Sequence, residues 1–201
     1  MERSVALESP LLIVGLGNPG AEHQKARHNT GWQVINRLAE ALGVDWRRSR
    51  AGEIADAQLG DRRIQLLKPQ TFMNLSGQAV AEALGGRDLT VGNVLVIYDD
   101  VEIKLGSWRV RSGGGHGGHN GIRSIIEQVG PEFLRLRVGV GPVPEHFGAS
   151  SSERELDKFV LAAFTTAEEK QLQELLDDLV PNLIKSVGSG EITLATQHSN
   201  K

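Results

Sequence analysis

The chain has 201 residues, of which 39% are hydrophobic and 23% are charged, and its formal net charge is −3. This composition is typical of a globular protein with one domain, and the absence of cysteine excludes disulfides and thiolate chemistry. No apolar run approaches the roughly 20 residues of a membrane span, and the polar start of the chain is unlike a secretory signal. We therefore expect a cytoplasmic protein in which residues 1–10 are a disordered N-terminal extension and residues 11–201 form one domain.

The first predicted element is a buried strand over Leu11–Leu16, which runs into the turn Gly15-Leu-Gly-Asn-Pro-Gly20. The pattern G-x-G-x-x-G after a strand also occurs in dinucleotide-binding proteins. Pro19 argues against that function because it removes a backbone N–H where a pyrophosphate needs one. The acid expected at the end of the second strand is also missing, since that strand ends at Lys68. A turn that only tightens the loop explains the glycines, but it does not explain Asn18.

A helix and a hairpin are predicted next. Thr30 and Gln33 fit a capping box at the start of an amphipathic helix, and Gly43 ends it. The segments Ile54–Leu59 and Arg63–Lys68 flank a Gly-Asp-Arg turn and are predicted as a hairpin.

The middle of the chain contains a central strand followed by two arginine-bearing strands. Val94–Tyr98 is apolar throughout, as expected for a strand covered on both faces, and it leads into Asp99 and Asp100 at its carboxyl edge. In each later strand apolar residues alternate with arginines, which places the arginines on one face. These arginines are Arg109 and Arg111 in the first strand, which turns them to solvent, and Arg135 and Arg137 in the second.

Two more helices complete the pattern. One begins near Asn120 and is stopped by Gly130-Pro131, and the last begins with the capping box Thr166…Glu169 and is kinked or split at Pro181. There are no repeats and no linker long enough to separate domains. The predicted fold is a single α/β domain with a central, mixed, twisted sheet flanked by helices, of the phosphorylase/hydrolase-like kind.

Charge is distributed unevenly along the chain. Residues 101–141 include six basic residues against three acids, whereas residues 153–180 include eight acids against three bases. A local basic face can bind phosphate while the opposite side keeps the protein soluble. Two ordinary solvated faces explain the same pattern, and charge alone favours them.

Five polar residues stand at the edges of predicted elements: Asn18, His28, Asn74, Asp99 and Asn120. Ligands of α/β folds collect outside the carboxyl ends of the strands. A histidine paired with a carboxylate is a general base, and asparagine amides orient and polarise a carbonyl. Four of these residues also have a structural explanation: His28 as a surface histidine, Asn120 as a helix cap, Asn74 as a turn residue and Asp99 as an exposed strand end.

Metal and nucleophile motifs are weak. His116 and His119 are three residues apart in a glycine loop, but no third ligand falls nearby at useful spacing, so we expect no metal and no cofactor. With no Gly-x-Ser-x-Gly motif and no cysteine, the expected nucleophile is water.

Five segments, in this order and spacing, resemble the motifs of bacterial peptidyl-tRNA hydrolases. They are Gly15–Gly20, Arg27-His-Asn29, Lys68-Pro-Gln-Thr-Phe-Met-Asn-Leu-Ser-Gly77, Asp99-Asp100 and Gly113-Gly-Gly-His-Gly-Gly-His-Asn-Gly121. The resemblance runs from about Leu11 to the last helix. It implies an enzyme that cuts the ester between a peptide and the 3′ end of its tRNA.

The resemblance also implies residue roles. His28 corresponds to the catalytic base, and Asp99 to the carboxylate that orients it. Asn74 and Asn120 correspond to amides that hold the substrate near the ester, and either could stabilise the oxyanion. Asn18 corresponds to the residue that distinguishes a blocked peptidyl nitrogen from the free amine of aminoacyl-tRNA.

Further implied contacts concern the peptide and the tRNA. Phe72 and Met73 match apolar contacts around the peptide or the terminal adenosine. Arg111 and Arg137 match basic residues that clamp the tRNA 5′ phosphate. The implied partner is therefore peptidyl-tRNA, at its acceptor stem and 3′ CCA end, with no membrane, no obligate protein partner and a monomeric enzyme.

The sequence departs from the family pattern in two places. His23 stands where many relatives have a Tyr in the substrate cleft, and Glu102 and Lys104 replace the common Asp and Pro after the Asp-Asp pair. A rival function is RNA binding without hydrolysis, as in plant organellar splicing factors that resemble the hydrolase. The intact His28, Asp99 and two asparagines favour the enzyme.

Overall fold

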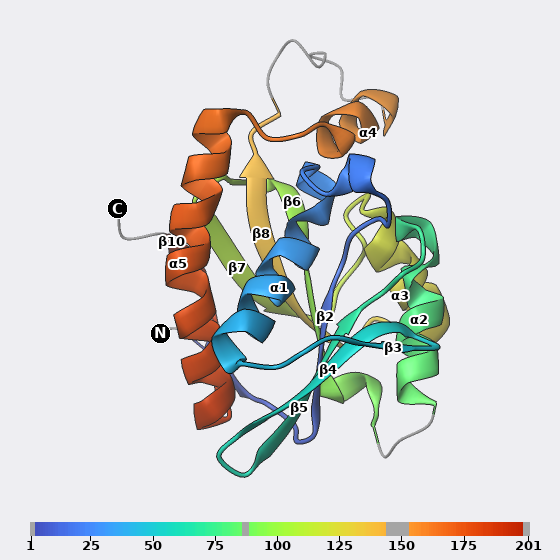
Figure 1. Ribbon diagram of the computed structural model, residues 1–201, viewed down its shortest axis with the longest axis vertical. Coiled ribbons are helices and arrows are strands. Elements are labelled where there is room, and N and C mark those ends of the chain that lie inside the picture. Colours follow the sequence, from blue (N-terminus) through green and yellow to red (C-terminus); the bar gives the residue numbers. More distant parts are fainter. Residues whose placement is uncertain (1–2, 86–88, 144–152, 199–201) are drawn as a thin grey trace.

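The computed structural model describes residues 3–85, 89–143 and 153–198 (Figure 1). Its centre is an eight-stranded sheet with the order β10-β7-β8-β6-β2-β5-β4-β3. The strands are β2 (Leu11–Gly15), β3 (Arg47–Ser49), β4 (Gly52–Leu59), β5 (Arg62–Lys68), β6 (Val94–Lys104), β7 (Ser107–Ser112), β8 (Leu134–Gly141) and β10 (Thr196–His198). The four central strands β5, β2, β6 and β8 are parallel and the outer ones antiparallel, which confirms the mixed sheet.

Helices cover both faces of this sheet. The α-helices are α1 (Thr30–Leu42), α2 (Ser76–Leu84), α3 (Asn120–Val129), α4 (Glu153–Leu161) and α5 (Thr166–Ser189), and the short 3-10 helices are η1 (Ala21–His23), η2 (Arg27–Asn29), η3 (Met73–Leu75) and η4 (Val91–Asn93). Helices α1 and α5 pack on one face and α2 and α3 on the other, while α4 lies at one end of the sheet (Figure 1). The single α/β domain predicted from the sequence is confirmed.

The unbroken apolar run of β6 reflects this double covering. Its side chains alternate between the two faces, so Leu95 and Ile97 join the core under α1 and α5. Val94, Val96 and Tyr98 join the core under α2 and α3. A strand segment that packs into both cores is therefore apolar at every position.

The prediction of a disordered extension over residues 1–10 is wrong for Arg3–Ala6, which forms β1, while Met1 and Glu2 lie outside the described residues. β1 pairs antiparallel with β9 (Glu191–Leu194) in a separate two-stranded sheet. Leu7 is buried, and its N–H donates to Gly190 O at 2.8 Å. The strand is too short to show a pattern, and its partner lies at the other end of the chain.

Three predicted helix signals differ in detail. The Oγ1 of Thr30 donates to Arg27 O at 2.7 Å instead of capping α1. The capping box of α5 is Thr165 with Glu168, one residue earlier than predicted. Helix α5 also runs through Pro181 without a break, because buried leucines on both sides keep it packed against the sheet.

Candidate active site

The site is built where η2 meets the carboxyl-end half of β6. His28 lies in η2 and Asp99 in β6, and both side chains are buried. His28 Nδ1 is 3.0 Å from both carboxylate oxygens of Asp99. His119, just before α3, places its Nε2 3.3 Å from Asp99 Oδ1. The structure therefore joins the predicted pair His28–Asp99 and adds a second histidine to the same carboxylate.

The hydrogen bonds of His119 fix where its proton lies. Its Nδ1 accepts from the N–H groups of Gly121 at 3.1 Å and Ile122 at 3.3 Å, so it caps α3. A neutral imidazole with an accepting Nδ1 has its proton on Nε2, which here donates to Asp99. Asn120, considered as the cap from sequence, is instead the first residue of the helix. The imidazole of His119 reaches two backbone donors and takes that place.

The charges of the site follow from burial and pairing. Burial opposes ionisation of Asp99, but His28 and His119 outweigh it and hold the pKa of Asp99 well below its ordinary value. Burial also opposes protonation of His28, yet the charge of Asp99 and the bond to it raise the pKa of His28 above 6.5. For His119 burial prevails, so its pKa is lowered and the ring is neutral at pH 7. With Nδ1–H donated to Asp99, His28 Nε2 is left as a basic nitrogen.

The same three side chains offer ligand atoms within 4.8 Å of one another, which invites the question of a metal. A metal at His119 Nε2 would require that nitrogen to lose the proton it donates. The other nitrogen cannot accept that proton, because it already accepts two backbone N–H bonds. The cluster thus has the chemistry of a hydrogen-bonded network and a poor set of metal donors.

Asn18 is fixed by a second network. Asn29, beside His28, accepts from Asn18 N–H and donates to Asn18 O, both at 2.9 Å. Asn18 Oδ1 in turn accepts from Met73 N–H at 2.8 Å. The Nδ2 group of Asn18 has no partner among the residues that the structure describes. Asn18 is therefore held in place with its NH₂ group left to donate.

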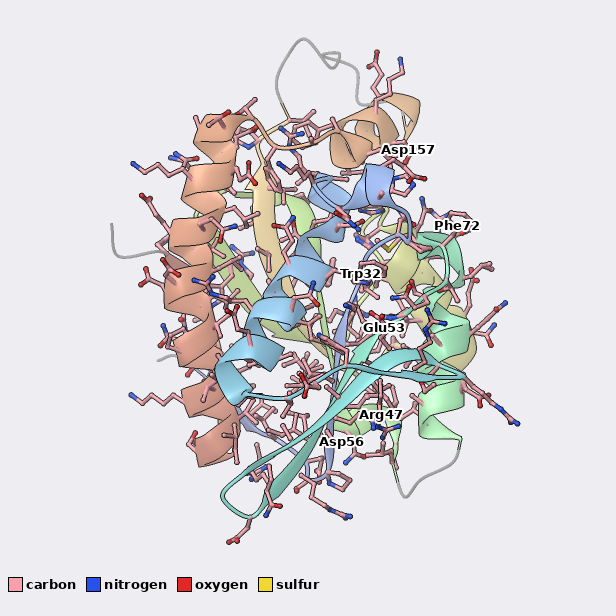
Figure 2. The ribbon with its side chains drawn as sticks, viewed as in Figure 1. Trp32, Arg47, Glu53, Asp56, Phe72 and Asp157 are labelled. Atoms are coloured by element: carbon pink, nitrogen blue, oxygen red, sulfur yellow. The ribbon has the colours of Figure 1, made fainter. Side chains whose placement is uncertain are left out.

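The remaining predicted residues lie around this core. Phe72 is 59% exposed and Asn74 is exposed, on either side of the buried Met73. Figure 2 labels Phe72 near the start of α2 and Asp157 on α4, on the same side of the molecule. Met73 packs closely on the start of α3, since a Cβ on Gly121 would lie 2.5 Å from its Sδ. This packing keeps the segments of Asn74 and Asn120 together.

His23 is half-buried in η1, with its Nε2 3.8 Å from Glu22 Oε1. It is not among the residues that line the cavity beside His28.

That cavity, of about 420 Å³, extends from the His28–Asp99 pair toward β7 and β8. Its wall includes Asn120, Arg111 and Arg137, and α4 closes one side. Arg111 is exposed, as the alternation in β7 predicts. Arg137 is buried, donates through Nε to Asp100, and donates through Nη2 to Glu102 at 3.1 Å.

The glycine loop beside the cavity is held by Arg135. Its guanidinium donates to the carbonyls of Gly114 and Gly115 at 2.5 Å each, and it stacks over Phe133. Gly113 and Gly114 have φ of 63° and 104°, a region that favours glycine. A buried arginine thus positions the loop that leads into His119.

Sequence reasoning missed His119 as a partner of Asp99, Asn29 as the support of Asn18, and Glu102 as a partner of Arg137. The signal for His119 was present in the pair His119-Asn120 at a helix start, where either residue can cap. For the other two the sequence offers only proximity to a motif.

Comparison with known proteins identifies the family of this chain. A sequence model of the family described as Peptidyl-tRNA hydrolase matches residues 12–201. The peptidyl-tRNA hydrolase of Rhodospirillum centenum is 44% identical over 170 residues, which cover 84% of this chain and 72% of the relative. That of Geobacter sp. strain M21 is 43% identical over 181 residues, 89% of this chain and 92% of the relative.

Solved structures agree as well. The crystal structure of peptidyl-tRNA hydrolase from Acinetobacter baumannii matches with a TM-score of 0.83 and 31% identity over 92% of each chain. A complex of peptidyl-tRNA hydrolase with N-propanol matches with a TM-score of 0.81 and 32% identity over 90% of this chain and 89% of the other. The chain therefore belongs to the peptidyl-tRNA hydrolase family.

Proposed function

We propose that this chain hydrolyses the ester of peptidyl-tRNA, the reaction of its family, with His28 as general base. The observation that carries the proposal is the contact of His28 Nδ1 with both oxygens of Asp99, which leaves Nε2 as the basic nitrogen. The ring lines the cavity together with Asn120. A fixed tautomer and a compensated imidazolium are what a general base needs.

The reaction then has two proton transfers. His28 Nε2 takes a proton from water as the water oxygen attacks the ester carbonyl, and the tetrahedral oxyanion is held by an amide N–H of Asn74 or Asn120. The C–O bond to the ribose breaks, and the proton on His28 passes to the 3′ oxygen that leaves. General-base catalysis supplies roughly 10²–10⁴-fold and an oxyanion donor about 10²–10³-fold.

Asn18 selects the substrate in this proposal. Its Oδ1 is engaged by Met73 N–H, so only its NH₂ group is left to bind a substrate. That donor suits the carbonyl oxygen of an acylated amine and gives nothing to an ammonium group. Aminoacyl-tRNA, with its free ammonium, is thereby disfavoured. Phe72 and Met73 supply apolar contact to the peptide or the terminal adenosine.

The tRNA acceptor stem and CCA end lie on the β7–β8 side in this proposal, with the 5′ phosphate at Arg111 and Arg137. The exposed Arg111 can bind a phosphate directly. Arg137 is already paired with Asp100 and Glu102, so a phosphate must compete with these carboxylates for it. The two arginines are therefore unequal, which the sequence pattern alone does not indicate.

We place the enzyme in the cytoplasm, where peptidyl-tRNA arises, and expect a monomer, since one chain supplies His28, Asp99 and His119 together. None of the described helices is long and apolar enough to span a membrane. Light scattering on the purified protein at assay concentration tests the monomer, and a dimer would contradict it.

The central experiment is the release of free tRNA from N-acetyl-aminoacyl-tRNA. His28→Ala should lose most of kcat, whereas His198→Ala, in β10 at the sheet edge, should retain it. Unblocked aminoacyl-tRNA should be cleaved far more slowly. If the wild-type chain binds the substrate without releasing tRNA, RNA binding without hydrolysis becomes the function.

A further inference from the structure

Arg27 directly precedes His28, yet its side chain points away from the chemistry described above. It is 4% exposed, which is unusual for an arginine, and the proposed reaction makes no use of it. Its guanidinium lies over the rings of Phe159 at 4.3 Å and Phe164 at 5.1 Å. These residues belong to the end of α4 and to the segment joining α4 to α5.

The guanidinium of Arg27 connects the junction between α4 and α5 to η2 through several hydrogen bonds. Nη1 donates to the carbonyls of Phe159, Ala162 and Ala163 at 3.4, 3.2 and 3.0 Å. These carbonyls lie at and just after the end of α4, where helix carbonyls lack partners of their own. Nη2 donates to both oxygens of Glu168 at 2.9 and 2.8 Å, so the two arms of the guanidinium hold two different sets of acceptors.

Glu168 belongs to the start of α5. The same carboxylate accepts from Thr165 N–H at 2.7 Å in the capping box of that helix. One ion pair therefore ties the end of α4, the start of α5 and the turn that contains His28. Main-chain bonds from Arg27 N to Ala162 O and from Phe164 N to Lys25 O follow the same connection.

Helix α4 is also a wall of the cavity. Leu156, Asp157 and Val160 line the cavity together with His28 (Figure 2 labels Asp157). We propose that Arg27, with Glu168 as its partner, is a positioning residue that holds the α4 wall in register with His28. This inference rests on the proposed function of His28, since a fixed wall matters to the reaction only if that histidine acts on the substrate.

Burying an ion pair is a poor way to gain stability, because the cost of desolvation offsets much of the attraction. A fork that satisfies three carbonyls and one carboxylate is, however, well suited to fix geometry. A displacement of about 1 Å in a catalytic site can cost about 10²-fold in rate. The position of the cavity wall relative to the base is the property that this pair controls.

The first test weakens the ion pair between Arg27 and Glu168 while keeping a polar side chain at both positions. Arg27→Lys keeps the charge but loses the fork, and Glu168→Gln keeps an acceptor for Thr165 N–H but loses the charge. We expect kcat on N-acetyl-aminoacyl-tRNA to fall about 10- to 100-fold in Arg27→Lys and less in Glu168→Gln. KM should change much less, because Arg111, the proposed contact to the tRNA phosphate, belongs to β7 and not to the junction between α4 and α5.

The matched control is the exposed pair Arg37–Asp177, which joins α1 to the same helix α5 at 2.5 Å. Arg37→Lys and Asp177→Asn make the same chemical changes and should leave kcat unchanged. Melting temperatures measured for all four variants show that each is folded under the conditions of the assay.

The second test restores the connection by another bond. Ala26 and Ala163 form an antiparallel bridge, and the main-chain bonds on either side of it identify the non-hydrogen-bonded type of pair. Such pairs have a Cα separation of about 4.5 Å, which a disulfide can span. The chain has no cysteine, so Ala26→Cys with Ala163→Cys introduces a single disulfide. In the Arg27→Lys background, oxidation should recover kcat and reduction should lose it again.

The outcomes separate the possibilities. Loss in Arg27→Lys with recovery on oxidation supports the positioning role. Unchanged kcat in Arg27→Lys overturns it, as does a loss that a confirmed disulfide, harmless in the wild-type background, does not restore. If the wild-type protein releases no tRNA, it is the proposed function that fails, and the failure is seen before any variant is made.

Discussion

Replacing Asp99 by Asn is expected to be more damaging than replacing it by Ala, although Asn is the closer match in shape. Asp99 Oδ1 receives both histidines, at 3.0 and 3.3 Å, whereas Oδ2 contacts His28 alone, at 3.0 Å. The proton of His119 is fixed on Nε2 by the cap that its Nδ1 makes. An asparagine at position 99 must therefore turn its carbonyl to the Oδ1 position and its NH₂ to the Oδ2 position.

The NH₂ group then lies at the Oδ2 position, 3.0 Å from His28 Nδ1, where it opposes an N–H on that nitrogen although the carbonyl is equally near. His28 responds by moving its proton to Nε2, the nitrogen that must accept a proton from water. The same tautomer error in a Ser-His-Asp triad lowers kcat about 10⁴-fold. At about 1.4 kcal/mol per tenfold change, this corresponds to about 5.5 kcal/mol of transition-state stabilisation.

Alanine at position 99 should cause a smaller loss in kcat than asparagine. It removes the orientation of His28 and the charge that stabilises the imidazolium, but it leaves the ring free to choose the active tautomer. We expect a loss of about 10²-fold, at the lower end of what a general base contributes. The acid limb of kcat/KM should also move to lower pH, because the carboxylate that raises the pKa of His28 is gone.

A second substitution makes this reasoning refutable. His119→Asn should retain the cap of α3, since Asn is a preferred N-cap residue, but it is too short to donate to residue 99. In the pair Asp99→Asn with His119→Asn, the amide can turn its carbonyl toward His28 Nδ1, and kcat should partly recover. Single-turnover release of tRNA measures the rates, and ¹⁵N NMR of the imidazole nitrogens reports the tautomer. Equal losses in the Asn and Ala variants, with no recovery in the pair, would refute the tautomer argument.

Four more outcomes follow from the site. Arg111→Ala should raise KM for tRNA with a 5′ phosphate and lower the log–log salt slope by about 0.7–0.9, while a short 3′ ester fragment is unaffected; equal losses on both substrates would contradict a phosphate contact. Glu102→Gln should weaken the hold on Arg137 and lower KM for the phosphorylated tRNA about two- to five-fold, as expected for an ion pair whose carboxylate is exposed, and an unchanged KM would rule out competition at this arginine. Asn18→Asp should narrow the preference for blocked substrates, because a carboxylate attracts the ammonium group, so unaltered selectivity counts against its role. The kcat/KM of the wild-type enzyme should fall as pH drops through a value above 6.5, since a raised pKa of His28 leaves the base protonated below it; a limb below that value would show that another group titrates.

The fold could be predicted where a segment is buried on both faces or bounded by turn residues. Val94–Tyr98 is apolar throughout because helices cover both faces of the sheet, and that pattern survives in any context. Strands β1, β3 and β10 have three or four residues each and lie outside the buried centre. Their pairing depends on partners elsewhere in the chain, which no local pattern contains.

The residues of the candidate site could likewise be predicted only in part. His28 and Asp99 could be paired from sequence because both follow elements whose ends meet at one edge of a parallel sheet. His119 was considered only as a metal ligand, since spacing along the chain cannot show that one ring nitrogen caps a helix. Arg27 and Glu168 are 141 residues apart, and neither has a motif that points to the other.

The contacts behind His28 fix one another in a definite order, and this order keeps His28 in its active tautomer. The backbone N–H groups of α3 fix the proton of His119, and that proton fixes one oxygen of Asp99. The carboxylate then has a single orientation in which both of its oxygens reach His28 Nδ1. His28 is thus held in its active tautomer by groups that exchange no proton during the reaction. A base supported in this way can be protonated and deprotonated in every turnover while its supporting hydrogen bonds remain in place, because Asp99, His119 and the N–H groups of α3 do not need to move.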